Sequence, residues 1–385
     1  MPTITSTADL QRLARRRVPR MFYDYADSGS YTEGTYRDNT SAFEKYQLRQ
    51  RVAVNIDNRS LKTEMVGKDV SMPVALAPVG LTGMQHPDGE IAAARAAEKF
   101  GVPFTLSTMS VCSIEAVAEA TTRPFWFQLY VMRDRGYIEA LIKRAYDANC
   151  EALVLTLDLQ ILGQRHKDVK NGLSTPPKLK LGTVLNLLTK PRWCFGMLGT
   201  KNRTFGNIVG HAPGVDNMNS LSEWTQSQFD QSLDWSSIEW IKARWDRKLI
   251  LKGINDVEDA KIAADIGADA IIVSNHGGRQ LDGAAAPIDL LARIVDAVGD
   301  RIEVHMDSGI RTGQDVFKAI AMGAKSTYIG RAYIYGLGAM GEQGVTKALE
   351  IVRSELDVTM ALCGETDINN VGRHNLLDFD ERSNR

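Results

Sequence analysis

A histidine and an arginine stand three residues apart in the glycine-rich stretch from Ser274 to Gln280. They are His276 and Arg279, and the apolar residues 270–273 before them predict a buried parallel strand. An imidazole can take up a proton near neutral pH, and a guanidinium can hold a carboxylate through two parallel hydrogen bonds. This spacing at the end of a rigid strand indicates chemistry on a small acid. Considered in isolation, the same residues fit a core histidine beside a surface arginine equally well.

The elements that position this pair follow a repeating pattern. Short apolar runs alternate with helical patterns, and eight such units within about 260 residues favour a closed (β/α)8 TIM barrel over an open doubly wound sheet. The expected strands cover residues 74–77, 104–107, 125–130, 152–157, 249–252, 270–274, 302–306 and 327–329.

Two segments fall outside the barrel, although we expect residues 1–385 to form a single domain. Residues 1–70 are predicted to be an N-terminal helical segment, with a helix start at Ser6-Thr7-Ala8-Asp9. Residues 172–235 interrupt the fourth strand-to-helix connection and exceed the usual length of such loops. They are predicted to form an insertion.

Composition argues against several classes of protein. The net charge of -1 gives no global basicity for nucleic acid, so no nucleic-acid partner is expected. The N-terminus lacks the apolar core of a signal peptide, and no apolar run reaches membrane-spanning length. The four cysteines are scattered without a CxxC pair, which favours buried thiols in a reducing, cytoplasmic setting over disulfides or a metal site.

Polar side chains follow nearly every predicted strand, at the end where barrel enzymes build their sites. Glycine-plus-arginine turns follow the last two strands, at Gly309 to Arg311 and at Gly330-Arg331. The loops after strands seven and eight are the usual phosphate site of this fold. With Lys252 and His276 facing the centre, the pattern indicates a phosphorylated cofactor or substrate.

These motifs stand in the same order as in a known family. The chain resembles the FMN-dependent L-2-hydroxy acid oxidising enzymes, which include glycolate oxidase, mandelate dehydrogenase and L-lactate dehydrogenase. The resemblance spans essentially the whole chain and rests on residues 72–81, 307–311 and 330–332. Within the family, the bacterial respiratory L-lactate dehydrogenases resemble it most. The resemblance implies FMN as the cofactor, a small 2-hydroxy acid as the substrate and a homotetramer.

The resemblance also implies roles for the polar residues. His276 would accept the proton of the substrate hydroxyl, Asp158 would stabilise the protonated imidazole, and Tyr130 would hydrogen-bond near that hydroxyl. Arg165 and Arg279 would clamp the substrate carboxylate with help from Tyr25. Without the resemblance, we would interpret Arg165 as a surface charge and Tyr25 as a packing tyrosine. For Tyr130, the alternative is a tyrosine that only lines the barrel.

For the cofactor, the resemblance implies that Lys252 lies by the pyrimidine edge of the flavin, where negative charge accumulates on reduction. The other implied FMN contacts are Pro78, Val79, Gly80, Ser107, Gln128, Thr156, Ser274, Asp307, Gly309, Arg311, Gly330 and Arg331. Residues 336–341 match G-x-G-x-x-G, but no strand turns directly into a helix there, so we interpret them as close helix packing.

Two positions bear on the substrate and the electron acceptor. Met109 stands where glycolate oxidase has a tryptophan, and Gly80 replaces an alanine typical of the oxidases. Met109 favours L-lactate over glycolate, and Gly80 favours a dehydrogenase over an oxidase. We therefore expect oxidation of L-lactate to pyruvate, with electrons passed to a quinone, an acceptor that fits a membrane-bound enzyme. The alternatives are an oxidase of the glycolate or lactate type that produces hydrogen peroxide, and a mandelate-type dehydrogenase. A flavin isomerase would have little use for two carboxylate-binding arginines.

The insertion indicates a membrane partner. No Asp or Glu occurs from Val169 to Val215, while lysines and arginines alternate there with leucine, tryptophan and phenylalanine. Such a sequence suits the surface of an anionic bilayer, so residues 172–215 are expected to bind the inner face of the cytoplasmic membrane peripherally. A lid over the site and an oligomer contact are the alternatives.

Overall fold

The computed structural model describes residues 3–173, 181–212, 214–215 and 228–377. Its main sheet has eight parallel strands in the order β3-β10-β9-β8-β7-β6-β5-β4. The backbone N–H of Leu76 donates to Pro103 at 2.9 Å, and Leu76 bridges Phe104, which closes the sheet between β3 and β4. The predicted TIM barrel is confirmed. The strands are β3 (Val74–Leu76), β4 (Thr105–Ser107), β5 (Trp126–Tyr130), β6 (Ala152–Thr156), β7 (Lys248–Ile254), β8 (Ala270–Val273), β9 (Glu303–Met306) and β10 (Ser326–Ile329).

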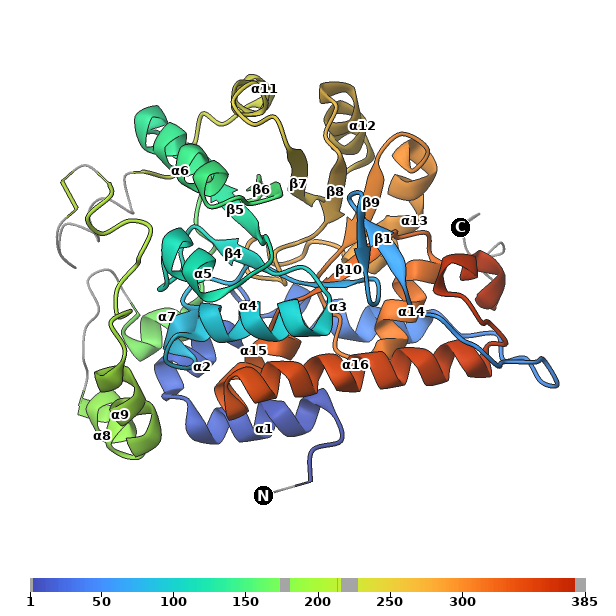
Figure 1. Cartoon of the computed structure of the whole chain (residues 1–385), viewed down its shortest axis with the longest axis horizontal. Coiled ribbons are helices and arrows are strands. Elements are labelled where there is room, and N and C mark those ends of the chain that lie inside the picture. Colours follow the sequence, from blue (N-terminus) through green and yellow to red (C-terminus); the bar gives the residue numbers. More distant parts are fainter. Residues whose placement is uncertain (1–2, 174–180, 213, 216–227, 378–385) are drawn as a thin grey trace.

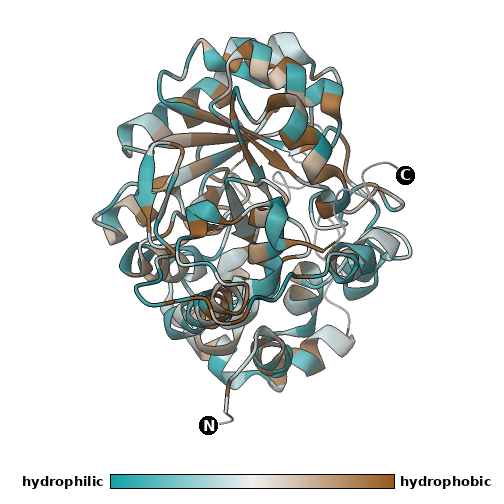
Figure 2. Cartoon of the chain, turned by 90° about the vertical axis from the view of Figure 1, so that its right-hand side faces the viewer, coloured by the Kyte–Doolittle hydropathy of each residue, from teal (hydrophilic) through white to brown (hydrophobic). Residues whose placement is uncertain are grey.

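Helices surround the barrel (Figure 1), and the strands consist mostly of hydrophobic residues (Figure 2) that are buried. The helices that follow the strands are α4 (Gly89–Phe100), α5 (Ile114–Ala120), α6 (Arg135–Asp147), α11 (Trp235–Lys242), α12 (Val257–Ile266), α13 (Pro287–Val298), α14 (Gly313–Ala321) and α15 (Arg331–Met340), and α16 (Glu342–Leu362) comes last. All four cysteines are free thiols, of which Cys194 alone is only partly buried.

The N-terminal segment is helical only in part. It contains α1 (Thr7–Arg17), capped by Ser6 as expected, α2 (Arg20–Ala26), α3 (Gly34–Ser41) and the short η1 (Ala42–Lys45). The prediction of a helical segment up to residue 70 is wrong for residues 46–70. They contain no helix and end in an antiparallel hairpin.

That hairpin consists of β1 (Thr63–Met65) and β2 (Lys68–Val70). Val66 and Gly67 form its two-residue turn with φ of 50° and 78°, the left-handed geometry that such turns need. Met65 and Val66 pack against the barrel residues Trp126 and Tyr328, so burial of the turn outweighs any local helical preference.

The G-x-G-x-x-G motif packs helices, as expected from the sequence. A Cβ on Gly336 would lie 2.2 Å from the carbonyl oxygen of Gly344, where α15 crosses the start of α16. A Cβ on Gly338 would lie 2.7 Å from Val18, just past α1. Glycine therefore lets α1 and α16 approach α15 closely.

The described part of the insertion packs on the N-terminal helices. After α7 (His166–Asn171) come α8 (Leu181–Leu188) and α9 (Pro191–Gly199), beside α2 (Figure 1). Residues 174–180, 213 and 216–227 of the predicted insertion lie outside the described residues. No helix in the described ranges is long and apolar enough to cross a membrane.

Candidate active site

A cavity of about 880 Å³ opens where the barrel strands end. The predicted residues that line it are Tyr25, Pro78, Val79, Gly80, Met109, Tyr130, Thr156, Arg165, Lys252, His276, Arg279, Asp307, Gly309, Arg311, Gly330 and Arg331. The remaining four, Ser107, Gln128, Asp158 and Ser274, stand behind this lining and hydrogen-bond to it or to one another. The structure thus brings every predicted site residue to one end of the barrel.

His276 and Asp158 form a hydrogen-bonded pair. Nδ1 of His276 lies 2.8 Å from Oδ1 of Asp158. Burial alone would raise the pKa of Asp158, but His276 and Lys252 nearby hold that pKa below its usual value. An ionised carboxylate only accepts hydrogen bonds, so Nδ1 carries the proton. In the neutral imidazole Nε2 is then the acceptor nitrogen, and His276 lines the cavity, which makes it a candidate base.

Gly253 makes room for this pair, and the sequence analysis did not include it. Its φ is +100°, and a Cβ there would lie 2.7 Å from Cγ of Asp158. The pairing of β7 with β8 shifts register between Lys252 and Ile254, so Gly253 sits in a bulge. An isolated glycine inside a strand pattern is the signal for such a site.

Lys252 is a buried cation with partners of its own. Its Nζ lies 2.8 Å from Oδ2 of Asp307 and donates to Oγ of Ser274 at 2.7 Å. Oγ of Ser308 donates to the other oxygen of Asp307 at 2.7 Å. Pairing offsets the cost of burying the charge, and the lysine remains at the cavity wall.

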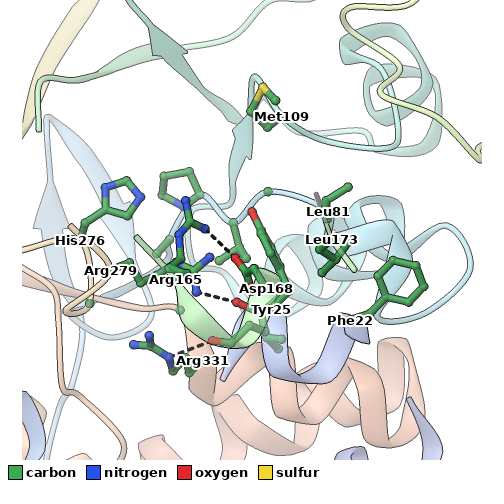
Figure 3. A pocket seen from close by; sticks show the side chains of 18 of the residues that line it. Phe22, Tyr25, Leu81, Met109, Arg165, Asp168, Leu173, His276, Arg279 and Arg331 are labelled. Atoms are coloured by element: carbon green, nitrogen blue, oxygen red, sulfur yellow. Dashed lines mark hydrogen bonds and ion pairs between the residues drawn. The ribbon is translucent and has the colours of Figure 1, made fainter. Parts of the chain in front are cut away.

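Arg165 and Arg279 approach the ring of Tyr25 together (Figure 3). Their guanidinium carbons lie 5.8 and 4.8 Å from the ring centre. Arg279 donates to the backbone oxygen of Tyr25 at 2.5 Å. Burial, and then repulsion by Arg165, lower the pKa of Arg279 to about 10. Two buried cations side by side favour an anion between them.

Asp168 is a site residue that sequence reasoning missed. Its Oδ2 lies 3.5 Å from Nη1 of Arg165, and it lines the cavity. Burial raises the pKa of Asp168, against the lowering effect of Arg279 and Arg165. It stands in the charged stretch Arg165 to Asp168, where no sequence signal separates it from a solvated helix residue. It neutralises part of the arginine charge.

A second pair of arginines lies at the ends of β9 and β10. Arg331 donates to the backbone oxygens of Ala26 at 2.9 Å and Ser28 at 2.7 Å, and its guanidinium stacks 4.6 Å from the ring centre of Tyr36. Burial and the neighbouring Arg311 lower the pKa of Arg331. The pair and the N-terminus of α15 suit a phosphate group.

Asp27 anchors the wall behind these arginines, and it was also missed. The hydroxyls of Tyr23, Tyr36 and Tyr335 donate to its carboxylate at 2.8, 2.7 and 2.7 Å. These bonds hold the pKa of Asp27 below its usual value although burial would raise it. Asp27 thereby fixes the ring of Tyr36 on which Arg331 stacks.

The remaining polar atoms fit FMN. Among the described residues, Nε2 of Gln128 and Oγ1 of Thr156 are buried without a hydrogen-bond partner. Buried polar groups are almost always paired, so both atoms point to a polar ligand. An amide donor, a hydroxyl and Lys252 suit the ring edge of a flavin, and Arg311 and Arg331 suit its phosphate. Asp307 lines the same cavity beside Lys252.

Comparison with known proteins agrees with this site. Residues 14–378 match the family described as FMN-dependent dehydrogenase. An L-lactate dehydrogenase of Caulobacter sp. (strain K31) is 44% identical over 98% of this chain and 99% of its own. A crystal structure of the monotopic membrane protein (S)-mandelate dehydrogenase is 35% identical, with a TM-score of 0.93 over 97% of this chain and 99% of its own. A mandelate oxidase mutant bound to (S)-mandelic acid is 36% identical, with a TM-score of 0.81 over 96% of this chain and 97% of its own.

The depressed pKa of Arg279 predicts a pH limit on anion binding. Below about pH 10 the guanidinium is charged and attracts a carboxylate; above it the free protein loses that charge. The affinity for oxalate, measured by titration calorimetry, should therefore fall up to about tenfold per pH unit above that pKa. Arg279→Gln should bind oxalate more weakly and show no such fall. An affinity of the unaltered protein that stays constant to about pH 11, with the fold intact by circular dichroism, contradicts the assignment.

Proposed function

The chain belongs to the family of FMN-dependent dehydrogenases, and from this membership we propose that it oxidises L-lactate to pyruvate. The observation that carries the proposal is the cavity in which the Arg165–Arg279 pair and the His276–Asp158 pair line or support one wall. The arginine pair binds a carboxylate, and the His276–Asp158 pair removes a proton. Oxidation of a 2-hydroxy acid requires both functions. Relatives named L-lactate dehydrogenase at 44–45% identity support the choice of substrate.

Each group then has one task. Arg165, Arg279 and the hydroxyl of Tyr25 bind the substrate carboxylate and orient carbon two. Nε2 of His276 takes the hydroxyl proton, and the ionised Asp158 stabilises the imidazolium that forms. Burial raises the pKa of Tyr130, so its neutral hydroxyl donates toward the substrate oxygen.

FMN, when bound, accepts the two electrons and the hydrogen that leave carbon two. Lys252 would stabilise the negative charge that a reduced flavin ring carries. The ring would be held by Ser107, Gln128, Thr156, Ser274 and the backbone from Pro78 to Gly80. The ribityl chain and the phosphate would contact Asp307, Gly309, Arg311, Gly330 and Arg331.

Room beside Gly80 supports a substrate with a small side chain. A Cβ on Gly80 would lie 2.9 Å from the hydroxyl of Tyr25 and 3.3 Å from Cβ of Met109. The glycine therefore leaves open the space between the carboxylate-binding tyrosine and a flexible apolar side chain. A methyl group fits such a wall, which favours L-lactate over glycolate. Mandelate remains the alternative substrate because of the structural neighbours.

We also propose that a membrane quinone receives the electrons and that the protein acts as a tetramer on the inner face of the cytoplasmic membrane. The described part of the insertion supports the membrane contact, since six of its large apolar side chains are exposed. They are Leu181, Val184, Leu185, Leu188, Phe195 and Leu198, of which Leu181 is 76% exposed. Lys190, Arg192, Lys201 and Arg203 alternate with them. Lys178 and Lys180 lie outside the described residues.

Flavin absorbance tests the function directly. L-Lactate should bleach the purified holoenzyme under anaerobic conditions, and the bleached state should persist in air and recover when a quinone is added. Fast recovery in air with formation of hydrogen peroxide would make the protein an oxidase. Bleaching by (S)-mandelate but not by L-lactate would show that the substrate is (S)-mandelate.

The dyad predicts an effect at a residue that touches no substrate. Gly253→Ala should push Asp158 away from His276 and lower kcat for L-lactate by about 10²-fold, the usual share of a general base. Gly283→Ala is the matched control, because Gly283 has a similar φ of +94° and nothing within 4 Å of its Cβ position. Equal steady-state rates for the two variants would show that Gly253 does not support catalysis by leaving room for Asp158.

The membrane contact predicts a difference between exposed apolar residues. Phe195→Glu should weaken co-sedimentation with anionic phospholipid vesicles about tenfold or more, since one large apolar side chain no longer enters the bilayer surface. Val52→Glu, at a site 79% exposed and far along the chain from the insertion, should change nothing. Equal binding by both variants would exclude α9 from the contact.

A further inference from the structure

Apolar side chains that the proposed reaction does not use also line the cavity. We call the part of the cavity beside six of them the apolar chamber: Phe22, Leu81, Met84, Leu173, Leu187 and Trp193. Figure 3 shows Phe22, Leu81 and Leu173 together on the side of Tyr25 that faces away from His276, and Met109 apart from them. The chamber is therefore separate from the polar wall that binds the carboxylate.

Contacts between distant segments hold the chamber in shape. The rings of Phe22 on α2 and Trp193 on α9 stack with centres 5.4 Å apart. Nε1 of Trp193 donates to the backbone oxygen of Met84 at 2.9 Å, so its polar atom is satisfied and its apolar ring faces the chamber. The N–H of Leu81 donates to the backbone oxygen of Met109 at 3.0 Å. The walls are preformed, as a binding site for an apolar ligand requires.

The chamber is continuous with the predicted flavin position. Leu81 directly follows Val79 and Gly80, which line the same cavity and which we assign to the flavin ring. A ligand in the chamber can therefore reach the cofactor without passing Arg165 and Arg279. Arg203 and Thr204 also line this cavity, and both side chains can donate hydrogen bonds to a carbonyl oxygen.

We propose that the apolar chamber binds the ring and the first side-chain carbons of a lipid quinone. This inference rests on the proposed function, in which a quinone is the electron acceptor. Reduced FMN would give the quinone two electrons and one proton, and the second proton would be the one that His276 took from the substrate hydroxyl. The quinone then leaves as the quinol, FMN is oxidised again and His276 returns to its neutral form. The chamber provides apolar contacts for the quinone ring, and α8 and α9 place the entrance of the chamber at the lipid surface.

Other occupants match the chamber less well. An oxygen molecule needs no preformed apolar wall, and an electron-transfer protein cannot enter a cavity of this size. The side chain of a long 2-hydroxy acid is the serious competitor, since it is also apolar. It would have to extend past Tyr25 from the carboxylate site, whereas Met109 and Gly80 already provide space for a substrate side chain.

Two leucines provide a matched pair for the test. Leu187 lines the chamber, and Leu362 at the end of α16 is 56% exposed and lies outside both the cavity lining and the insertion. Leu187→Trp should narrow the chamber and raise KM for a short-chain ubiquinone about tenfold or more in vesicle-free buffer, relative to KM for ferricyanide. Leu362→Trp should leave that ratio unchanged. The rate of flavin bleaching by L-lactate is measured for each variant, so that effects on the first half-reaction are separated.

Photolabelling gives a readout that does not depend on turnover. An azido-ubiquinone, irradiated with the holoenzyme, should attach to peptides that contain Phe22 or Trp193, and excess ubiquinone should suppress the labelling. Labelling elsewhere, or an equal change of the KM ratio in both variants, overturns the proposal. A selective loss of activity of Leu187→Trp on longer L-2-hydroxy acids also overturns it, because the chamber then binds substrate. If L-lactate bleaches the flavin but no quinone restores it, the assignment of the acceptor fails while the oxidation of L-lactate stands.

Discussion

Two guanidinium groups held side by side in a buried cavity are the constraint on which the rest of the site depends. Arg165 and Arg279 repel each other, and burial strengthens that repulsion because little water screens it. The protein offsets the free-energy cost of this repulsion mainly with the partial negative charges of backbone oxygens and of an aromatic ring, and less with a carboxylate. Backbone oxygens of Tyr25 and Ser28 accept from Arg279, the Tyr25 ring lies under both groups, and Asp168 pairs with Arg165. Enough positive charge remains for a carboxylate to be the missing partner.

The same arrangement recurs at the other end of the cavity. Arg331 is held by backbone oxygens and an aromatic ring, near a second arginine and without an ion pair among the described residues. Carbonyl oxygens orient a guanidinium without cancelling its charge, so both arginine pairs remain available to an anion. The His276–Asp158 pair and Lys252 differ from them, since each has a carboxylate partner at 2.8 Å. Among the four arginines, Arg165 has the carboxylate partner Asp168, at the longer distance of 3.5 Å.

Sequence reasoning located the barrel and the polar residues at its strand ends because both depend on local patterns. An apolar run followed by a polar residue marks the end of a parallel strand, and all eight ends meet at one face. Tyr25 and Arg165 lie away from strand ends and were predicted only through the family resemblance.

Asp27, Asp168 and Gly253 were not found. Asp168 stands in a charged stretch without a distinguishing signal, and the roles of Asp27 and Gly253 arise from contacts between distant segments. Asp27 accepts hydrogen bonds from tyrosine hydroxyls of α2, α3 and α15. A glycine is needed at position 253 only because Asp158 lies against it. The hairpin at residues 63–70 was missed for a similar reason, since its turn is stabilised by burial against the barrel.

Helix α2 and the turn after it serve both halves of the cavity. Backbone oxygens of Tyr25, Ala26 and Ser28 orient Arg279 and Arg331, while Phe22, one turn earlier, stacks on Trp193 of the insertion. The two ligand positions therefore share one short rigid body. A ligand on the Trp193 side that displaces this helix must alter the affinity for the carboxylate, and thermodynamic reciprocity requires the carboxylate to alter the affinity of that ligand by the same factor.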